Sequence, residues 1–172
     1  MTCTNLTSDE MEPIYNGYGG GTRRGVQCTT GMPCIGDLIS NVSFKLNKVG
    51  SPTGTCQFAV WDSSNVLKCS LGTIDVSSLT TDSSGEDYEL SSPSTTYNLA
   101  NGDIIACEYT GGDGSNKINQ GTEHVNTHTG EAYADYPSNA WRYQTGKNVY
   151  FKLNGDDPAE ASILLPPPVA WI

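Results

Sequence analysis

The sequence predicts an all-β protein: a two-sheet, jelly-roll-like sandwich with extended arms at its N- and C-terminal ends. Three observations predict this fold. Apolar residues alternate with polar ones over short runs, turn residues separate these runs, and the strong helix formers that fill helix surfaces are scarce. The 172 residues include 19 Gly and 9 Pro, and only 16% are charged. One domain is expected, since a single β sandwich commonly contains roughly 100 to 200 residues.

The alternation divides the chain into three parts. Residues 1–37 show no period and are interrupted by glycine and proline, which predicts an irregular N-terminal arm. Residues 38–153 are expected to form the sandwich. Residues 154–172 begin with a turn and end in an apolar segment whose three consecutive prolines favour an extended backbone. This last part is expected to be a C-terminal tail.

Strand-like segments follow one another through the middle part. Residues 42–47 alternate strictly and predict a strand with one buried face. Residues 55–61 and 66–71 predict a hairpin, because a turn sequence separates them. Residues 104–109 follow Asn101-Gly102 and begin with an apolar run, which predicts a strand buried on both faces. Further strands are expected at 73–76, 87–90, 96–99, 117–120, 140–143 and 148–153.

Several of these segments together resemble a known kind of module. The likeness is carried by strand and turn motifs at residues 39–46, 49–54, 71–75, 97–103 and 108–112. They resemble jelly-roll β-sandwich modules of the carbohydrate-binding or lectin-like kind, which occur in phage and virus structural proteins and in microbial surface proteins. The resemblance implies a sandwich used for adhesion, glycan contact or decoration of a larger particle. It bears on fold more than on function, because its motifs are not catalytic.

The charge of the chain excludes two classes of partner. The formal net charge is -10, and the chain has nine Lys and Arg residues. It therefore offers no basic face to the phosphates that dominate nucleic-acid affinity, and neither nucleic acid nor an anionic membrane is an expected partner. Membrane insertion is not expected either, because no segment reaches the ~20 apolar residues of a membrane helix.

Six cysteines indicate disulfide bonds and an oxidising environment, such as a virion surface or the extracellular space. Cys56 and Cys69 are expected to face each other across the hairpin, because their spacing places both on one face. Cys28 and Cys34 are expected to close the short loop between them. The N-terminus lacks the basic start and apolar run of a signal peptide. This favours a virion protein exposed after host lysis, with a processed secreted domain as the alternative.

Aromatic residues provide the candidate ligand contacts. Tyr133, Tyr136 and Trp141 surround turn residues in a stretch expected to be irregular, where exposed aromatic rings would be unusual without a partner. Aromatic faces pack against the apolar faces of sugar rings, so these three residues are the predicted glycan contacts. Trp61 and Tyr143 are further candidates for such a platform, although Trp61 adjoins a strand that is expected to be buried.

Two metal sites are considered, and no other cofactor is expected. Asp113 and Asn116 stand in a glycine-rich loop and offer the oxygen ligands that calcium prefers, but a plain hairpin loop explains them equally. His124 and His128 would share one face of a helix, as metal ligands do, but their neighbours favour a surface loop.

The sequence predicts a protein without enzymatic activity. No Gly-x-Ser-x-Gly elbow is present, and nothing in the sequence fixes two carboxylates across a cleft. The carboxylates considered for such a pair are Glu86, Asp87, Glu89, Glu108 and Glu131. A small hydrolase on the same scaffold remains an alternative that a deep cleft with two converging carboxylates would support.

The leading interpretation is a surface structural protein, most specifically a capsid decoration or fibre component of a virion. The alternative is a free carbohydrate-binding module of a secreted or cell-surface protein. The C-terminal tail is expected to be ordered against a neighbouring copy or another virion or surface protein, because its apolar side chains would be costly to leave in water. These side chains belong to Ile163, Leu164, Leu165, Val169, Trp171 and Ile172.

Overall fold

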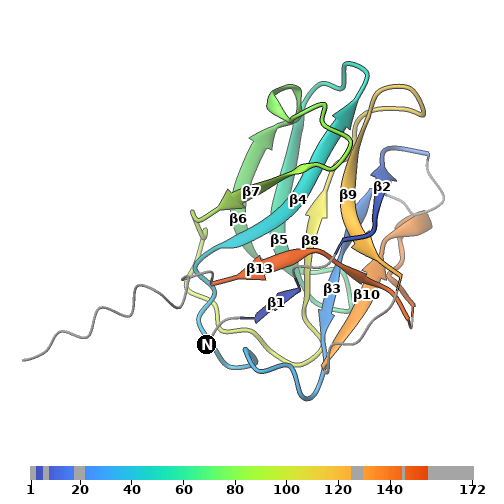
Figure 1. The fold of residues 1–172 in the computed structure, drawn as a ribbon. Coiled ribbons are helices and arrows are strands. Elements are labelled where there is room, and N and C mark those ends of the chain that lie inside the picture. Colours follow the sequence, from blue (N-terminus) through green and yellow to red (C-terminus); the bar gives the residue numbers. More distant parts are fainter. Residues whose placement is uncertain (1–2, 6–7, 18–21, 125–129, 145, 155–172) are drawn as a thin grey trace, which may run out of the picture.

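The computed structural model describes residues 3–5, 8–17, 22–124, 130–144 and 146–154, and these form two packed antiparallel sheets (Figure 1). The all-β, two-sheet sandwich is therefore confirmed. Among the described residues there is no α-helix, and the helical segments are the two 3₁₀ turns η1 (Val76–Ser78) and η2 (Pro137–Asn139). No helix within these ranges has the length and apolar character needed to cross a bilayer.

One sheet has seven strands and the other has six. The first is ordered β1-β13-β4-β9-β12, with β2 paired to β9 and β7 paired to β4. The second is ordered β11-β10-β3-β8-β5-β6. The strands of the first sheet are β1 (Cys3–Asn5), β2 (Glu10–Ile14), β4 (Val42–Val49), β7 (Glu86–Leu90), β9 (Lys117–Glu123), β12 (Asn148–Val149) and β13 (Phe151–Leu153). Those of the second are β3 (Arg23–Cys28), β5 (Thr55–Trp61), β6 (Leu67–Asp75), β8 (Ile104–Glu108), β10 (Glu131–Asp135) and β11 (Arg142–Gln144).

The core lies between the two sheets and follows the period of two. On β4, Val42, Phe44 and Leu46 are fully buried, as the alternation predicts. Phe44 meets Phe58 of the opposite sheet edge to face, with 5.0 Å between the ring centroids. A second, smaller apolar cluster covers the outer face of the six-stranded sheet. It consists of Ala59, Trp61, Ile104, Ala106 and Ala134, with Trp141 packed against it.

The structure corrects the prediction for the N-terminal segment. Residues 1–37 were expected to be an irregular arm, but β1, β2 and β3 come from this part of the chain. The strand β3 lies inside the six-stranded sheet, where it pairs with β10 on one side and β8 on the other. Val26 and Cys28 face the core and Gln27 between them is less buried, but the charged Arg24 occupies the preceding core-facing position, so the alternation is too short to recognise. Periodicity alone therefore misses this strand.

Most of the other predicted strands are present, but several begin or end at different residues. The hairpin is present, but β6 runs without a break through Gly72, where the chain has a positive φ of 123° and the register to β5 shifts. Residues 96–99 form only an isolated bridge between Asn98 and Leu38. The strand β10 was not expected, because the Tyr and Ala residues in it lie beside the turn residues that follow.

The cysteine pairing differs from the prediction. A disulfide joins Cys3 to Cys34 and so links β1 to the loop after β3. Cys28 is a buried free thiol, which overturns the Cys28–Cys34 bridge. The Cys56–Cys69 bridge is also wrong: Cys56 lies opposite Ile74, whereas Cys69 lies opposite Val60, farther along the hairpin. The two cysteines share a face but not a position along it. The C-terminal tail predictions, from Ile163 to Ile172, fall outside the described residues.

Candidate ligand-binding site

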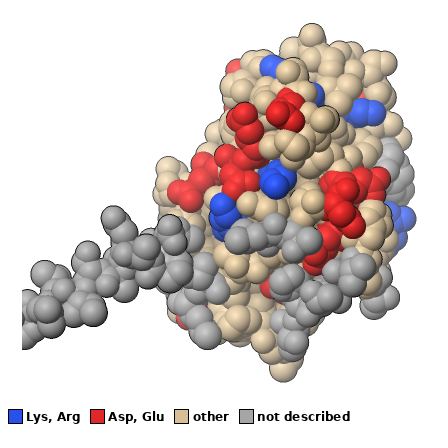
Figure 2. All heavy atoms as spheres, viewed as in Figure 1, with Lys and Arg blue, Asp and Glu red and all other residues tan. Residues whose placement is uncertain are grey.

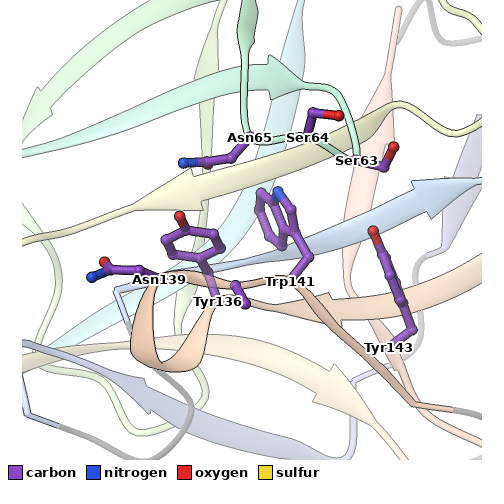
Figure 3. Close-up of a pocket in the computed structure, with 8 residues that line it drawn as sticks. Ser63, Ser64, Asn65, Tyr136, Asn139, Trp141 and Tyr143 are labelled. Carbon is purple, nitrogen blue, oxygen red and sulfur yellow. The ribbon is translucent and has the colours of Figure 1, made fainter.

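A pocket of about 370 Å³ opens between the β5–β6 turn and the η2–β11 segment (Figure 3). This volume is in the range of small-molecule sites. In Figure 3 the rings of Tyr136 and Trp141 project from one side toward the turn on the other, with Tyr143 farther along. The lining residues are Ser63, Ser64, Asn65, Tyr136, Asn139, Ala140, Trp141 and Tyr143.

The β5–β6 turn is held in shape by Asp62. Its carboxylate accepts hydrogen bonds from the backbone N–H groups of Ser64 and Val66, each at 2.9 Å. A hydrogen bond from Lys68 and these backbone donors lower the pKa of Asp62, so the carboxylate stays charged at neutral pH. Asn65 takes the left-handed conformation at φ 67°, which asparagine tolerates better than most residues. The turn therefore presents two serine hydroxyls and an amide on a defined backbone.

The opposite wall is the short segment η2. Pro137 occupies its first position, where a fixed φ and a missing N–H cause no loss. The Ala140 N–H closes the turn on the Pro137 carbonyl at 3.2 Å, and Asn139 has a φ of 63°. The Tyr136 N–H donates to the Arg23 carbonyl at 3.1 Å, which joins this wall to β3.

Arg23 lies beneath the pocket and contacts a residue of each wall. Its guanidinium carbon lies 4.5 Å from the ring centroid of Tyr136 and 4.9 Å from that of Trp61, within the range of cation–π contacts. Its Nε donates to Glu108 Oε1 at 2.6 Å, and its Nη1 donates to the Asn65 side chain on the turn. Glu108 thus neutralises the Arg23 charge beneath the pocket, and the Arg23 side chain positions both Tyr136 and Asn65.

The aromatic rings form a continuous cluster. Trp141 meets Tyr136 edge to face with 5.0 Å between centroids, and it lies 6.3 Å from Trp61. Trp61 is buried, Tyr136 is 7% exposed, Trp141 is half-buried and Tyr143 is 42% exposed. The exposed edges of Trp141 and Tyr143 are therefore the parts that a ligand reaches first.

One polar atom in the cluster has no partner. The Trp141 indole Nε1 is buried and makes no hydrogen bond within the part of the chain that the structure describes. A buried donor without an acceptor costs about 1–3 kcal/mol.

The structure brings together two of the three predicted glycan contacts. Tyr136 and Trp141 line the pocket, and Tyr143 joins them. Tyr133 is a correction: it lies on β10, is 1% exposed and faces the interior, where its hydroxyl accepts a hydrogen bond from Arg24 Nε at 2.7 Å. Sequence reasoning missed Arg23 and the turn residues Ser63, Ser64 and Asn65. The turn itself was a visible signal, but nothing in the sequence placed it opposite Trp141.

A buried ionic group lies between the sheets on the other face of β3. The Arg24 side chain is almost fully buried and pairs with Glu12 Oε2 at 3.3 Å, and Lys147 also contacts Glu12. Arg24 donates further hydrogen bonds to the Glu12 and Pro13 carbonyls. Burial raises the pKa of Glu12, but Arg24, Lys147 and the Tyr133 hydroxyl outweigh it and hold the pKa below its ordinary value.

The structure describes one of the two histidines considered as metal ligands. His124 Nε2 lies 2.8 Å from Glu10 Oε2, and its Nδ1 lies 3.2 Å from Asp9 Oδ1; His128 falls outside the described residues. Among the described residues, Glu10, Glu12 and His124 are the one group of three whose ligand atoms lie within 4.8 Å of one another. Arg24 and Lys147 already neutralise Glu12, which disfavours a cation there. Figure 2 shows acidic side chains gathered on this side of the molecule, over β2.

The predicted calcium ligands are brought together as loop-capping groups. Asp113 Oδ1 accepts from the backbone N–H groups of Ser115 and Asn116 at 2.7 and 2.8 Å, and these bonds lower the pKa of Asp113. Asn116 Oδ1 accepts from the Ser51 N–H at 3.0 Å. Asp113 thus stabilises the β8–β9 loop itself, as the plain hairpin explanation expects, and Asn116 links this loop to the β4–β5 turn.

The five candidate carboxylates are spread over both sheets. Glu86, Asp87 and Glu89 lie on the edge strand β7, where Asp87 accepts from the Tyr150 hydroxyl at 2.7 Å and pairs with Lys152. Glu108 pairs with Arg23, and Glu131 accepts from Asn148 at 2.5 Å. Acidic side chains gather over β7 in Figure 2, with basic side chains next to them. The structure therefore gives most of these carboxylates local partners.

Comparison with known proteins adds no relative: no protein-family model, curated protein or solved structure matches this chain.

Proposed function

We propose that this protein is a non-enzymatic surface structural protein, such as a capsid decoration or fibre component of a virion, that contacts neutral carbohydrate through its aromatic pocket. The observation that carries the binding part is the pocket between the β5–β6 turn and η2. It combines aromatic rings for the apolar face of a sugar with hydroxyl and amide groups for its hydroxyls. A free carbohydrate-binding module is the alternative setting for the same site.

The lining of the pocket supports a neutral ligand. None of its eight lining residues carries a formal charge. Arg23, beneath the pocket, is engaged by Glu108, Asn65 and two aromatic rings, and Arg142, between two lining residues, pairs with Asp135. An acidic sugar would bring a carboxylate to a site with no uncommitted cation, so its desolvation would not be compensated. Neutral hexoses and their oligomers fit the chemistry best.

A glycan array on the whole protein tests the proposal. We expect binding to neutral glycans, and we expect Trp141→Ala or Tyr143→Ala to weaken it at least about tenfold, the effect of losing ~1.4 kcal/mol of contact. Tyr15→Ala is the matched control, because Tyr15 is a tyrosine outside the pocket. Selective binding to acidic glycans, or neutral-glycan binding that survives both pocket substitutions, would overturn the assignment.

The anchoring of Asn154, the last residue that the structure describes, supports the proposed role in assembly. Asn154 is anchored beside residues 38–40: its Nδ2 donates to the Leu38 carbonyl at 2.7 Å, and its Oδ1 accepts from the Ser40 N–H at 2.7 Å. Leu38 is 50% exposed and, with Ile39 and Pro93, lines a groove of about 320 Å³ whose other lining residues are Ser40, Thr95 and Thr96. Eight residues separate this anchor from the apolar sequence of residues 163–172.

Deleting residues 163–172 is expected to leave a folded, soluble sandwich that no longer assembles. Light scattering on native and truncated protein measures the assembly, and circular dichroism checks the fold. A chain of unchanged length with serine at Leu164, Leu165 and Trp171 is the control for length, and it should behave like the deletion. The assembly role fails if the truncated chain unfolds while the full chain is a stable monomer in dilute solution.

A further inference from the structure

Two buried sulfur atoms in the six-stranded sheet lie closer than contact allows. Cys56 of β5 and Cys107 of β8 are both fully buried, and their Sγ atoms are 2.6 Å apart. Non-bonded heavy atoms settle at about 3.5–4.0 Å, whereas the sulfurs of a disulfide lie about 2.0 Å apart. The observed separation is therefore nearer to a bond than to a contact between two thiols.

The strand register places both side chains on the same face. The strands β5 and β8 are neighbours, with Phe58 opposite Cys107. Cys56 stands two residues before Phe58, so it points to the same side of the sheet and is diagonal to Cys107. Twist in an antiparallel pair shortens one of the two diagonals, and this brings such side chains within reach.

We propose that Cys56 and Cys107 form a second disulfide bond, which joins β5 to β8 inside the core and leaves Cys28 and Cys69 as thiols. The other two cysteines have different surroundings. The register separates Cys28, at the end of β3, from Cys69 of β6 by both β8 and β5. The Cys69 sulfur lies 3.5 Å from the Thr95 carbonyl, where it can donate a weak hydrogen bond.

The bond requires a disulfide oxidant, such as oxidised glutathione or a thiol–disulfide oxidoreductase. The thiolate of one cysteine attacks the oxidant, forms a mixed disulfide and releases one thiol. The second cysteine, as a thiolate, attacks the sulfur of the first and releases the other oxidant thiol. Two electrons pass to the oxidant, and the two thiol protons end on its two released thiols.

Burial determines when this reaction takes place. Desolvation raises the pKa of the Cys56 thiol far above its ordinary value, and the contact with Cys107 raises it further. The nucleophile in exchange is the thiolate, and an oxidant must also reach the sulfur. In the folded, reduced protein both conditions fail, so the bond forms before β5 and β8 are buried. A chain folded without an oxidant keeps the two thiols.

Peptide mapping tests the proposal on the full chain. The protein is refolded in a buffer of reduced and oxidised glutathione, denatured, alkylated and digested without reduction. We expect Cys3 linked to Cys34, Cys56 linked to Cys107, and alkylation at Cys28 and Cys69. Recovery of alkylated Cys56 and Cys107, or of Cys56 linked to Cys69, would overturn the second disulfide. Because the map uses the unaltered chain, it does not depend on whether a cysteine variant folds.

A second measurement tests the timing and the stabilisation. Protein folded in reductant is exposed to oxidised glutathione with and without denaturant; the Cys56–Cys107 link should appear only when denaturant is present. The linked form should melt about 10 °C above the form with free thiols at these positions, since the link closes a long loop. A link that forms equally fast in the folded protein contradicts the burial argument, and equal melting temperatures contradict the stabilisation.

Discussion

Replacing Arg24 with methionine is expected to lower the free energy of unfolding by about 3 kcal/mol, because it leaves the partly buried Glu12 carboxylate with one cation instead of two. The substitution also removes donors to Tyr133 and to two backbone carbonyls. Urea denaturation measures the change. The control is Lys152→Met, which breaks the more exposed pair with Asp87 and should cost no more than about 1 kcal/mol.

The pH dependence distinguishes the ionic contribution from lost packing. The pKa of Glu12 is held below its ordinary value of 4.5 in the folded protein. The stability that this shift contributes is present above pH 4.5 and is lost as the pH falls through the folded pKa. The difference between native protein and Arg24→Met should therefore shrink in acid. A difference that stays constant from neutral pH into acid would show that Glu12 is not responsible.

Gly25→Ala should destabilise the protein by about 3 kcal/mol or more, or prevent folding. An added Cβ would lie 2.0 Å from the Ile105 carbonyl oxygen and 2.6 Å from the Ala106 Cα. Both atoms belong to the backbone of the paired strand β8, so relief requires β3 and β8 to separate. The control is Gly114→Ala, whose Cβ would meet only the Tyr15 hydroxyl at an ordinary 3.7 Å. A Gly25→Ala protein as stable as this control would contradict the packing of β3.

Arg24→Met and Gly25→Ala both lie on β3, the strand that the sequence pattern does not predict. The strand β4 can be predicted because its buried apolar residues Val42, Phe44 and Leu46 alternate with polar residues along the sequence. The strand β3 is covered on both faces, and its polar residues are satisfied by distant partners. Arg24 meets Glu12 inside, and Arg23 meets Glu108 and two aromatic rings outside. A local pattern cannot show such partners.

The candidate site was predictable only in part for the same reason. The aromatic residues near Pro137 indicated a contact surface, and Tyr136 and Trp141 do line the pocket. The alternation that turns Tyr133 away from this surface could not be recognised in the sequence, because β10 is a short strand next to turn residues. The partner wall comes from a turn more than seventy residues earlier in the chain, and only the sheet order β10-β3-β8-β5 brings the two together.

The most direct test of the account is the indole N–H resonance of Trp141 during titration with a neutral oligosaccharide. The chain has three tryptophans, and Trp141→Phe and Trp61→Phe assign their signals. We expect the Trp141 signal to move in a saturable way, a smaller change for Trp61 beneath it, and none for Trp171. If the oligosaccharide binds while the Trp141 signal stays in place, the sugar is held elsewhere and the pocket is not the binding site.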